Sequence, residues 1–286
     1  MKNLLAALAP TLAVAGCLLA GAVHAQPLSP QQIEAIVASP DRSAADRTND
    51  LRRKPQQMLE FIGVHPGITA LDLSAAGGYT TELLARSAGR SGKVYGQSRP
   101  RPEGQSSPAP AAPEGNSHPG AAPAPVGTAA APARPAPRPS PVALAERDKA
   151  LQGKAAPIVA VVRPFEDPVP PEAQGHLDLV TLMFNYHDLG HLGVDRAAMN
   201  RAVFRALKPG GLYVIADHAG RPGTGISESG TLHRIEEAFL RQEVEAAGFR
   251  LVEEGTFLRN PNDPKDKNTP DPPQPKDEFV LKFVRP

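Results

Sequence analysis

The sequence predicts a doubly wound α/β fold, in which helices cover both faces of a mostly parallel sheet of about seven strands. The first observation is an apolar run at 68–73, followed by the glycines Gly77 and Gly78 and by a helix that starts near Thr81. The second is the alternation of strand and helix patterns along the rest of the chain. The third is a final pair of strands with no helix between them, which predicts one antiparallel strand.

The remaining elements follow from hydrophobic periodicity and from turn residues. Helices are expected at 29–38 and at 44–62, the second of them bent or restarted at Pro55. After the first strand and its helix, strands are expected at 93–96, 158–162, 177–184, 212–216, 250–258 and 278–284. Further helices are expected at 142–151, 195–207 and 232–247, with the turn 208–211 ending the helix before the 212–216 strand.

The first 25 residues form a predicted signal peptide. Lys2 precedes an apolar stretch, and Val23, His24 and Ala25 have the small-residue spacing of a signal-peptidase site. We therefore expect an exported protein, periplasmic or secreted, that begins at Gln26. Acylation of Cys17 in a lipoprotein is the lesser alternative, and an uncleaved membrane anchor is the third. No membrane span is expected after signal cleavage.

Two compositional shifts divide the mature chain. Residues 100–141 are rich in Ala, Pro, Gly and Ser and are predicted to be a disordered insertion, because they offer too little apolar surface to form a core. The insertion interrupts one domain, whose halves are 26–99 and 142–286. A second polar, proline-rich stretch at 260–277 is predicted to be a long exposed loop.

Charge and cysteine content exclude several kinds of function. The formal net charge is +1 and no basic run carries interleaved aromatics, so the sequence makes no electrostatic case for nucleic acid. Cys17 is the only cysteine and lies in the leader, which removes disulfides, thiolate zinc sites and cysteine nucleophiles from the mature chain. We expect a small-molecule substrate; the oligomeric state is not predicted.

Several motifs carry a resemblance to a known family. The turn Lys208-Pro-Gly-Gly211 before a strand, followed later by Ala247-Gly-Phe249, resembles the class I S-adenosylmethionine-dependent methyltransferases, which have a Rossmann-like fold. More narrowly, the segments 46–55, 77–82, 186–188, 217–218, 232–235 and 258–261 look like those of a bacterial family of predicted, often exported methyltransferases. The resemblance covers 41–99 and 142–286 and leaves the insertion out.

The resemblance implies S-adenosylmethionine as the cofactor and a set of residues that bind it. These would be Asp72, the turn Ala76, Gly77 and Gly78, Tyr79 beside it, Gln97 at the end of the second strand, and Asn185. The chain departs from the general motif in two places. Ser74 and Ala76 replace glycines, and Gln97 replaces the usual ribose-binding carboxylate, so that only a neutral hydrogen bond remains there. A dinucleotide is disfavoured because the turn lacks the G-x-G-x-x-G spacing.

Catalytic candidates follow the strands at 177–184 and 212–216, where an open α/β sheet presents its ligands. They are His187, Asp188 and His218, with Tyr186 and Asp217 beside the expected acceptor pocket. His187 or His218 is a candidate base because imidazole titrates near neutral pH, although each could simply hold loop backbone. A structural role is favoured for His233 and Arg234, and a solvated helix charge for Arg53, with pairing to a ligand carboxylate as its alternative.

A metal site is not predicted. His187 and His191 are four residues apart, with Asp188, Asp217 and His218 nearby, but Leu189 and Gly190 argue against the regular helix that would give this spacing its geometry. The predicted function is methyl transfer to an unknown acceptor. The alternatives are a degenerate protein that binds a nucleoside, small ligand or partner without catalysis and, third, a metal-dependent hydrolase.

Overall fold

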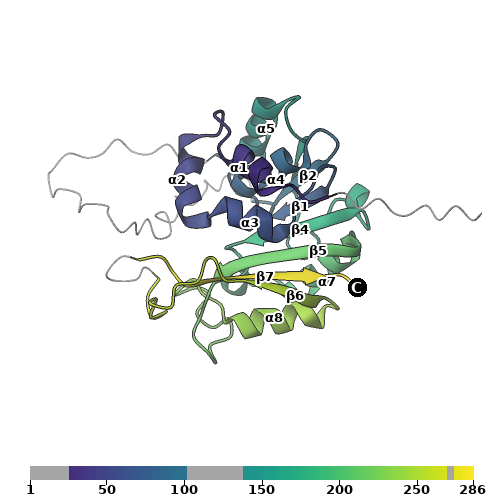
Figure 1. Ribbon diagram of the computed structural model, residues 1–286. Helices are drawn as coiled ribbons and strands as arrows, with labels where there is room; N and C mark the ends of the chain where they lie inside the picture. Colours follow the sequence, from purple (N-terminus) through teal and green to yellow (C-terminus); the bar gives the residue numbers. More distant parts are fainter. Residues whose placement is uncertain (1–25, 102–137, 269–273) are drawn as a thin grey trace, which may run out of the picture.

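The computed structural model describes residues 26–101, 138–268 and 274–286, and they build one seven-stranded sheet (Figure 1). The strand order is β3-β2-β1-β4-β5-β7-β6. All strands run parallel except β7, which pairs antiparallel with β5 and with β6. The bounds are β1 (Thr69–Leu73), β2 (Lys93–Ser98), β3 (Ile158–Val162), β4 (Leu177–Met183), β5 (Leu207–His218), β6 (Arg250–Gly255) and β7 (Glu278–Val284). The predicted fold class is confirmed.

Local sequence signals mark the starts of the first and third helices. Ser29 forms a capping box with Gln32 at the start of the first helix, and the break at Pro55 is real, since Lys54 adopts a left-handed conformation there. The helices are α1 (Pro30–Val37), α2 (Ala44–Arg53), α3 (Pro55–Ile62), α4 (Tyr79–Ala88), α5 (Ser140–Leu151), the single turn α6 (Asp188–His191), α7 (Arg196–Ala206) and α8 (Glu237–Ala246), with a 3-10 turn at Pro171–Ala173.

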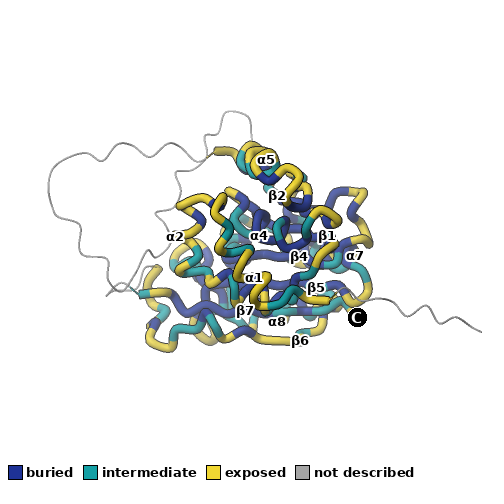
Figure 2. The backbone as a smooth tube through the Cα atoms, turned by 45° about the horizontal axis from the view of Figure 1, so that its top comes forward, coloured by how far each residue is buried: buried dark blue, intermediate teal, exposed yellow. Residues whose placement is uncertain are grey.

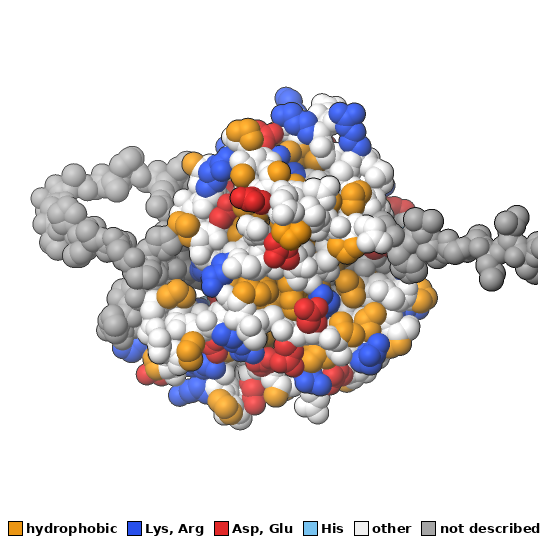
Figure 3. Space-filling model, viewed as in Figure 1, with side chains coloured by type: hydrophobic (Ala, Val, Ile, Leu, Met, Phe, Trp, Pro, Cys, Tyr) orange, Lys and Arg blue, Asp and Glu red, His pale blue; other side chains and the backbone are white. Residues whose placement is uncertain are grey.

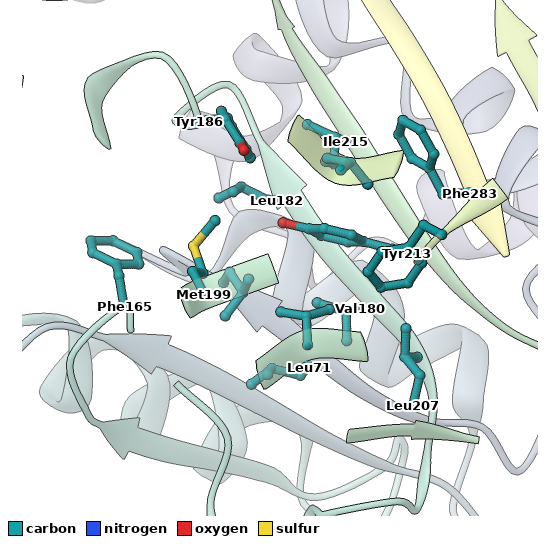
Figure 4. Packing of buried hydrophobic residues seen from close by; sticks show 14 of the residues in the cluster. Leu71, Phe165, Val180, Leu182, Tyr186, Met199, Leu207, Tyr213, Ile215 and Phe283 are labelled. Atoms are coloured by element: carbon teal, nitrogen blue, oxygen red, sulfur yellow. The ribbon is translucent and has the colours of Figure 1, made fainter. Parts of the chain in front are cut away.

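Each face of the sheet has its own apolar core. On one face, side chains such as Leu71, Val180 and Tyr213 pack together and against α7 and α8 (Figure 4). On the other, Ala70, Leu179 and Val214 pack under α1, α3, α4 and α5. Neighbouring residues of one strand therefore serve opposite cores. Figure 2 shows the central strands buried, whereas the edge strand β6 carries exposed residues.

Three sequence predictions are corrected. The expected helix at 232–247 begins only at Glu237, because His233 has a φ of +51° that no helix accommodates. The stretch 260–277 is not simply exposed, since Asp263 and Asp277 are buried. The turn 208–211 lies inside the long strand β5, where the register with β4 shifts. The signal peptide and most of the predicted insertion fall outside the described residues.

The surface gives little further direction about partners. Basic and acidic side chains are intermixed on the face drawn in Figure 3, in keeping with a formal net charge of +1. Among the helices in the described residues, none is both long and apolar enough to cross a bilayer.

Candidate functional site

The turn after β1 holds a strained backbone. Ser74 and Ala76 have φ values of +56° and +47°, in the left-handed region where residues with a Cβ are disfavoured. These are the two positions at which the resemblance described above leads one to expect glycine. The backbone adopts a glycine-type conformation at both of them, and such strain persists where the surroundings impose it.

The two glycines of the turn play different roles. Gly78 has a φ of +80°, and a Cβ there would lie 2.7 Å from Leu144 Cδ2 and 2.9 Å from Arg147 Cδ, so the glycine lets α5 pack onto the turn. Gly77 has no positive φ, and its Cβ would meet nothing within 4 Å. The Arg147 guanidinium donates to the Gly77 carbonyl at 2.6 Å. Packing within the protein therefore explains the glycine at position 78 but not the one at position 77.

Asp72 lies beneath the turn. It is 2% exposed, and its two carboxylate oxygens accept hydrogen bonds from the Thr81 hydroxyl at 2.6 Å and the Thr181 hydroxyl at 2.9 Å. Burial raises the pKa of Asp72 to about 6, against the opposing effect of those hydroxyls and of Arg53. The carboxylate thus ties β1 to α4 and β4 and supports the turn from inside.

Gln97 is also an internal support. Its side chain is fully buried, its Oε1 accepts from the Ser74 backbone N–H at 3.0 Å, and its Nε2 donates to the Arg163 carbonyl at 2.7 Å. Both ends of the amide are committed to backbone. The neighbouring Ser98 lies on the cavity described next, because consecutive residues of a strand face opposite sides, and Arg99, just after the end of β2, also lies on it.

A cavity of about 420 Å³ lies at the carboxyl ends of β1, β2 and β4. Its lining includes Ala76 from the turn, Ser98 from β2, and Asn185, Asp188 and His191 from the segment after β4. Asn185 is fixed on both sides, since its Oδ1 accepts from the Ser74 hydroxyl at 2.6 Å and its Nδ2 donates to Asp188 Oδ2 at 2.9 Å. The carboxyl edge of this sheet therefore carries a pocket of ligand size, with polar groups held in place.

A second cavity, of about 670 Å³, lies on the other side of the turn and is lined by Gly77, Glu82 and residues of α5. The two cavities share Ala76, Arg101 and Ser140. The turn thus borders ligand-sized space on both sides.

Tyr186, His187, Asp217 and His218 are the residues expected beside an acceptor pocket, and all are at most 1% exposed. The Tyr186 hydroxyl donates to Glu243 at 2.9 Å. His218 Nδ1 lies 3.0 Å from the buried Glu278 Oε1, and the His218 ring stacks at 5.7 Å from that of Phe184. The structure brings these residues together behind the cavity, not on its wall.

Two carboxylates flank the imidazole of His187. Its Nδ1 lies 2.5 Å from Asp217 Oδ1, and its backbone N–H donates to Asp217 Oδ2 at 2.7 Å. Burial favours the neutral ring, but Asp217 and Asp188 outweigh it and raise the pKa of His187 to about 10. The near-neutral titration expected for a base is therefore not found at His187.

Arg53 is not the solvated charge favoured by the sequence. Its guanidinium lies over the rings of Tyr79 and Phe184, at 5.1 and 4.8 Å from their centroids. Burial, together with the neighbouring Arg52, lowers the pKa of Arg53 to about 10. The Tyr79 hydroxyl donates to Asp50 at 2.7 Å, so α2 is anchored directly to the first residue of α4.

The histidines that approach one another are not the pair with the suggestive spacing. His187, Asp188 and His233 bring possible ligand atoms within 4.8 Å of one another, while His191 lies at the edge of the group with its Nδ1 at 3.7 Å from Asp188. The sequence favoured only a structural role for His233, because its approach to Asp188 depends on a loop 45 residues further along the chain. Arg234 is structural, as expected, and pairs with the buried Asp263 at 2.8 Å.

No family model and no curated protein matches the chain. Solved structures do. A SAM-dependent methyltransferase from Aquifex aeolicus is 16% identical, with a TM-score of 0.53 over 91% of this chain and 100% of that one. CrArsM, an arsenic(III) S-adenosylmethionine methyltransferase from Chlamydomonas reinhardtii, is 12% identical, with a TM-score of 0.50 over 90% of this chain and 73% of that one.

The cyclase SpnF is 15% identical, with a TM-score of 0.50 over 93% of this chain and 88% of that one. At such low identity these likenesses establish the fold alone. The fold is compatible with more than one chemistry, since the solved structures include both methyltransferases and a cyclase.

Proposed function

We propose that the protein transfers a methyl group from S-adenosylmethionine to a small-molecule acceptor that remains to be identified. The observation that carries the proposal is the 420 Å³ cavity at the carboxyl ends of β1, β2 and β4. Open α/β sheets bind their ligands outside these ends, where the strand order reverses. In the order β3-β2-β1-β4-β5-β7-β6 that reversal lies between β1 and β4.

The residues of the cavity fit a nucleoside cofactor. Ser98 and Asn185 present polar side chains to this cavity, the space at Gly77 is open on the side of the neighbouring 670 Å³ cavity, and Asp72 and Gln97 hold the turn from below. When bound, S-adenosylmethionine supplies a methyl group activated by its sulfonium. The protein's own task is then alignment and exclusion of water, which needs a rigid pocket. The internally bonded Asp72 and Gln97 provide that rigidity.

An acceptor has room at the end of the cavity formed by Asp188 and His191. A carboxylate and an imidazole there can hydrogen-bond a hydroxyl or an amine. Asn185, which is bonded to Asp188 and borders the same cavity, links this end to the turn. We therefore place the acceptor beside α6, and not among the buried residues His187 and His218.

Binding without catalysis is the second candidate, and one observation favours it. No carboxylate occupies the end of β2, and the Gln97 amide is wholly engaged with backbone, which leaves the ribose hydroxyls of a cofactor to Ser98 and to backbone groups. A ligand-binding protein could tolerate that loss as well as an enzyme could.

A matched pair of measurements separates the two. We expect S-adenosylmethionine to raise the melting temperature of the wild-type chain and to have no such effect on Gly77→Val, whose larger side chain enters the open space beside the turn. Catalysis is then tested by incubating the protein with methyl-labelled S-adenosylmethionine and an extract of small molecules, and by measuring the label transferred to those molecules. Stabilisation with no transfer supports the binding protein, and stabilisation of Gly77→Val equal to that of wild type contradicts the cofactor site.

Export is part of the proposal, and the pattern at residues 1–25 supports it. We expect the mature protein to begin at Gln26, which the intact mass of protein recovered from outside the cytosol would show. Acylation at Cys17 would replace that outcome with a lipoprotein, and retention of Met1 in a cytosolic protein would contradict export.

A further inference from the structure

The buried imidazole of His187 is held in one orientation. Its Nδ1 lies 2.5 Å from the Asp217 carboxylate, so Nε2, on the other side of the ring, points away from Asp217. The side chain is fully buried, yet Nε2 meets the geometry of no hydrogen bond within the described residues. It lies 3.1 Å from Asp188 Oδ1. A carboxylate that holds one imidazole nitrogen so that the other faces a ligand is the usual second shell of a metal-bound histidine.

Two histidine nitrogens converge on Asp188 Oδ1. His233 Nδ1 lies 2.8 Å from this oxygen, and His187 Nε2 lies 3.1 Å from it. Ligands placed about 2.1 Å from a metal ion and about 90° apart are about 3 Å from one another. The two measured separations match that spacing. The other carboxylate oxygen of Asp188 is held by the Asn185 amide, which fixes the direction of Oδ1.

The loop that carries His233 is anchored to the segment His187–His191. His233 has a φ of +51°, a strained conformation for a residue with a Cβ. In the same loop, the Ser229 hydroxyl donates to the His187 carbonyl at 2.5 Å and accepts from the His191 backbone N–H at 2.9 Å. The loop is thereby fastened to α6, and the three ligand atoms come from segments that are fixed relative to one another.

We propose that His187 Nε2, Asp188 Oδ1 and His233 Nδ1 bind a divalent transition-metal ion. Two imidazoles and one carboxylate on one side of the ion leave its remaining positions open, as in catalytic zinc and non-haem iron sites. Asp188 also lines the 420 Å³ cavity, so an oxygen of a small molecule in that cavity can reach the ion. The inference rests on the geometry of this cluster and not on methyl transfer.

The test uses zinc as the probe and the full chain, stripped with a chelator, in the absence of S-adenosylmethionine. We expect calorimetry and elemental analysis to show about one zinc ion per chain. His233→Gln is the decisive variant, because this residue is partly exposed and its loss need not disturb the core. It should weaken zinc binding at least about tenfold, as should Asp188→Asn, with circular dichroism unchanged.

Two controls make the result specific. His65→Gln changes a partly exposed histidine remote in sequence from the cluster and should bind zinc like the wild type. His191→Gln removes the histidine at the edge of the cluster and should retain binding. A folded wild-type chain without stoichiometric zinc would overturn the proposal, and so would His233→Gln with wild-type affinity. Absence of zinc binding would not decide whether the chain binds S-adenosylmethionine, which is tested by the separate measurement of its melting temperature.

Discussion

Replacing Gly78 with alanine should destabilise the fold, whereas the same change at Gly77 should not. At Gly78 the φ of +80° imposes a left-handed conformation that costs a residue with a Cβ about 1–2 kcal/mol. The new methyl group would also lie 2.7 Å from Leu144 Cδ2, and such overpacking costs about 1–3 kcal/mol. The free energy of unfolding should therefore fall by about 2–5 kcal/mol.

Gly77→Ala is the matched control, because its Cβ meets nothing within 4 Å and its φ is not positive. Its effect should lie within about 0.5 kcal/mol. Urea unfolding followed by circular dichroism measures both variants against the wild type. Equal destabilisation by the two alanines, or an unchanged stability of Gly78→Ala, would refute the reasoning that only Gly78 is required by packing and by its backbone conformation.

Three further predictions concern stability. Ala76→Gly should raise the free energy of unfolding by up to about 1 kcal/mol, because it relieves a φ of +47°, and thermal melting that shows a loss would argue against strain at the turn. The pKa of Asp72 is raised in the fold to about 6 from 3.8, so its contribution is present below the lower value and lost as pH rises through the upper one. Urea unfolding of wild type relative to Asp72→Asn should show a loss of up to about 3 kcal/mol across that window, and a flat or rising difference would contradict it. Asp263→Asn should cost about 3–5 kcal/mol, because it leaves the fully buried Arg234 without its carboxylate, and a chemical melt within about 1 kcal/mol of wild type would contradict that pairing.

Much of the fold follows from short-range patterns in the sequence. The bounds predicted for β3 and β7 are those observed, because each strand is a nearly continuous apolar run. The antiparallel final strand follows from the missing crossover helix. The interruption at Pro55 follows from the chemistry of proline itself.

The mispredicted elements depend on features that local sequence patterns do not show. The late start of α8 reflects the positive φ of His233. The burial of Asp263 reflects its ion pair with Arg234, and the residues around either one do not reveal the other. A polar, proline-rich segment is predicted to be exposed unless the residue that pairs with its buried charge is known.

The sequence predicted which segments surround the cavity but not the directions in which their side chains point. Ala76, Asn185 and Asp188 do line the cavity, whereas Gln97 is turned inward and Ser98 outward by the alternation of the strand. The approach of His233 to Asp188 depends on loop geometry, which no periodicity encodes.

The most direct test of the account is calorimetric titration of the purified chain with S-adenosylmethionine and with its demethylated product. We expect micromolar binding, which corresponds to roughly −8 kcal/mol, and weaker binding by Gly77→Val. No detectable heat of binding by either compound, in a wild-type chain shown to be folded by circular dichroism, would contradict the proposed cofactor site.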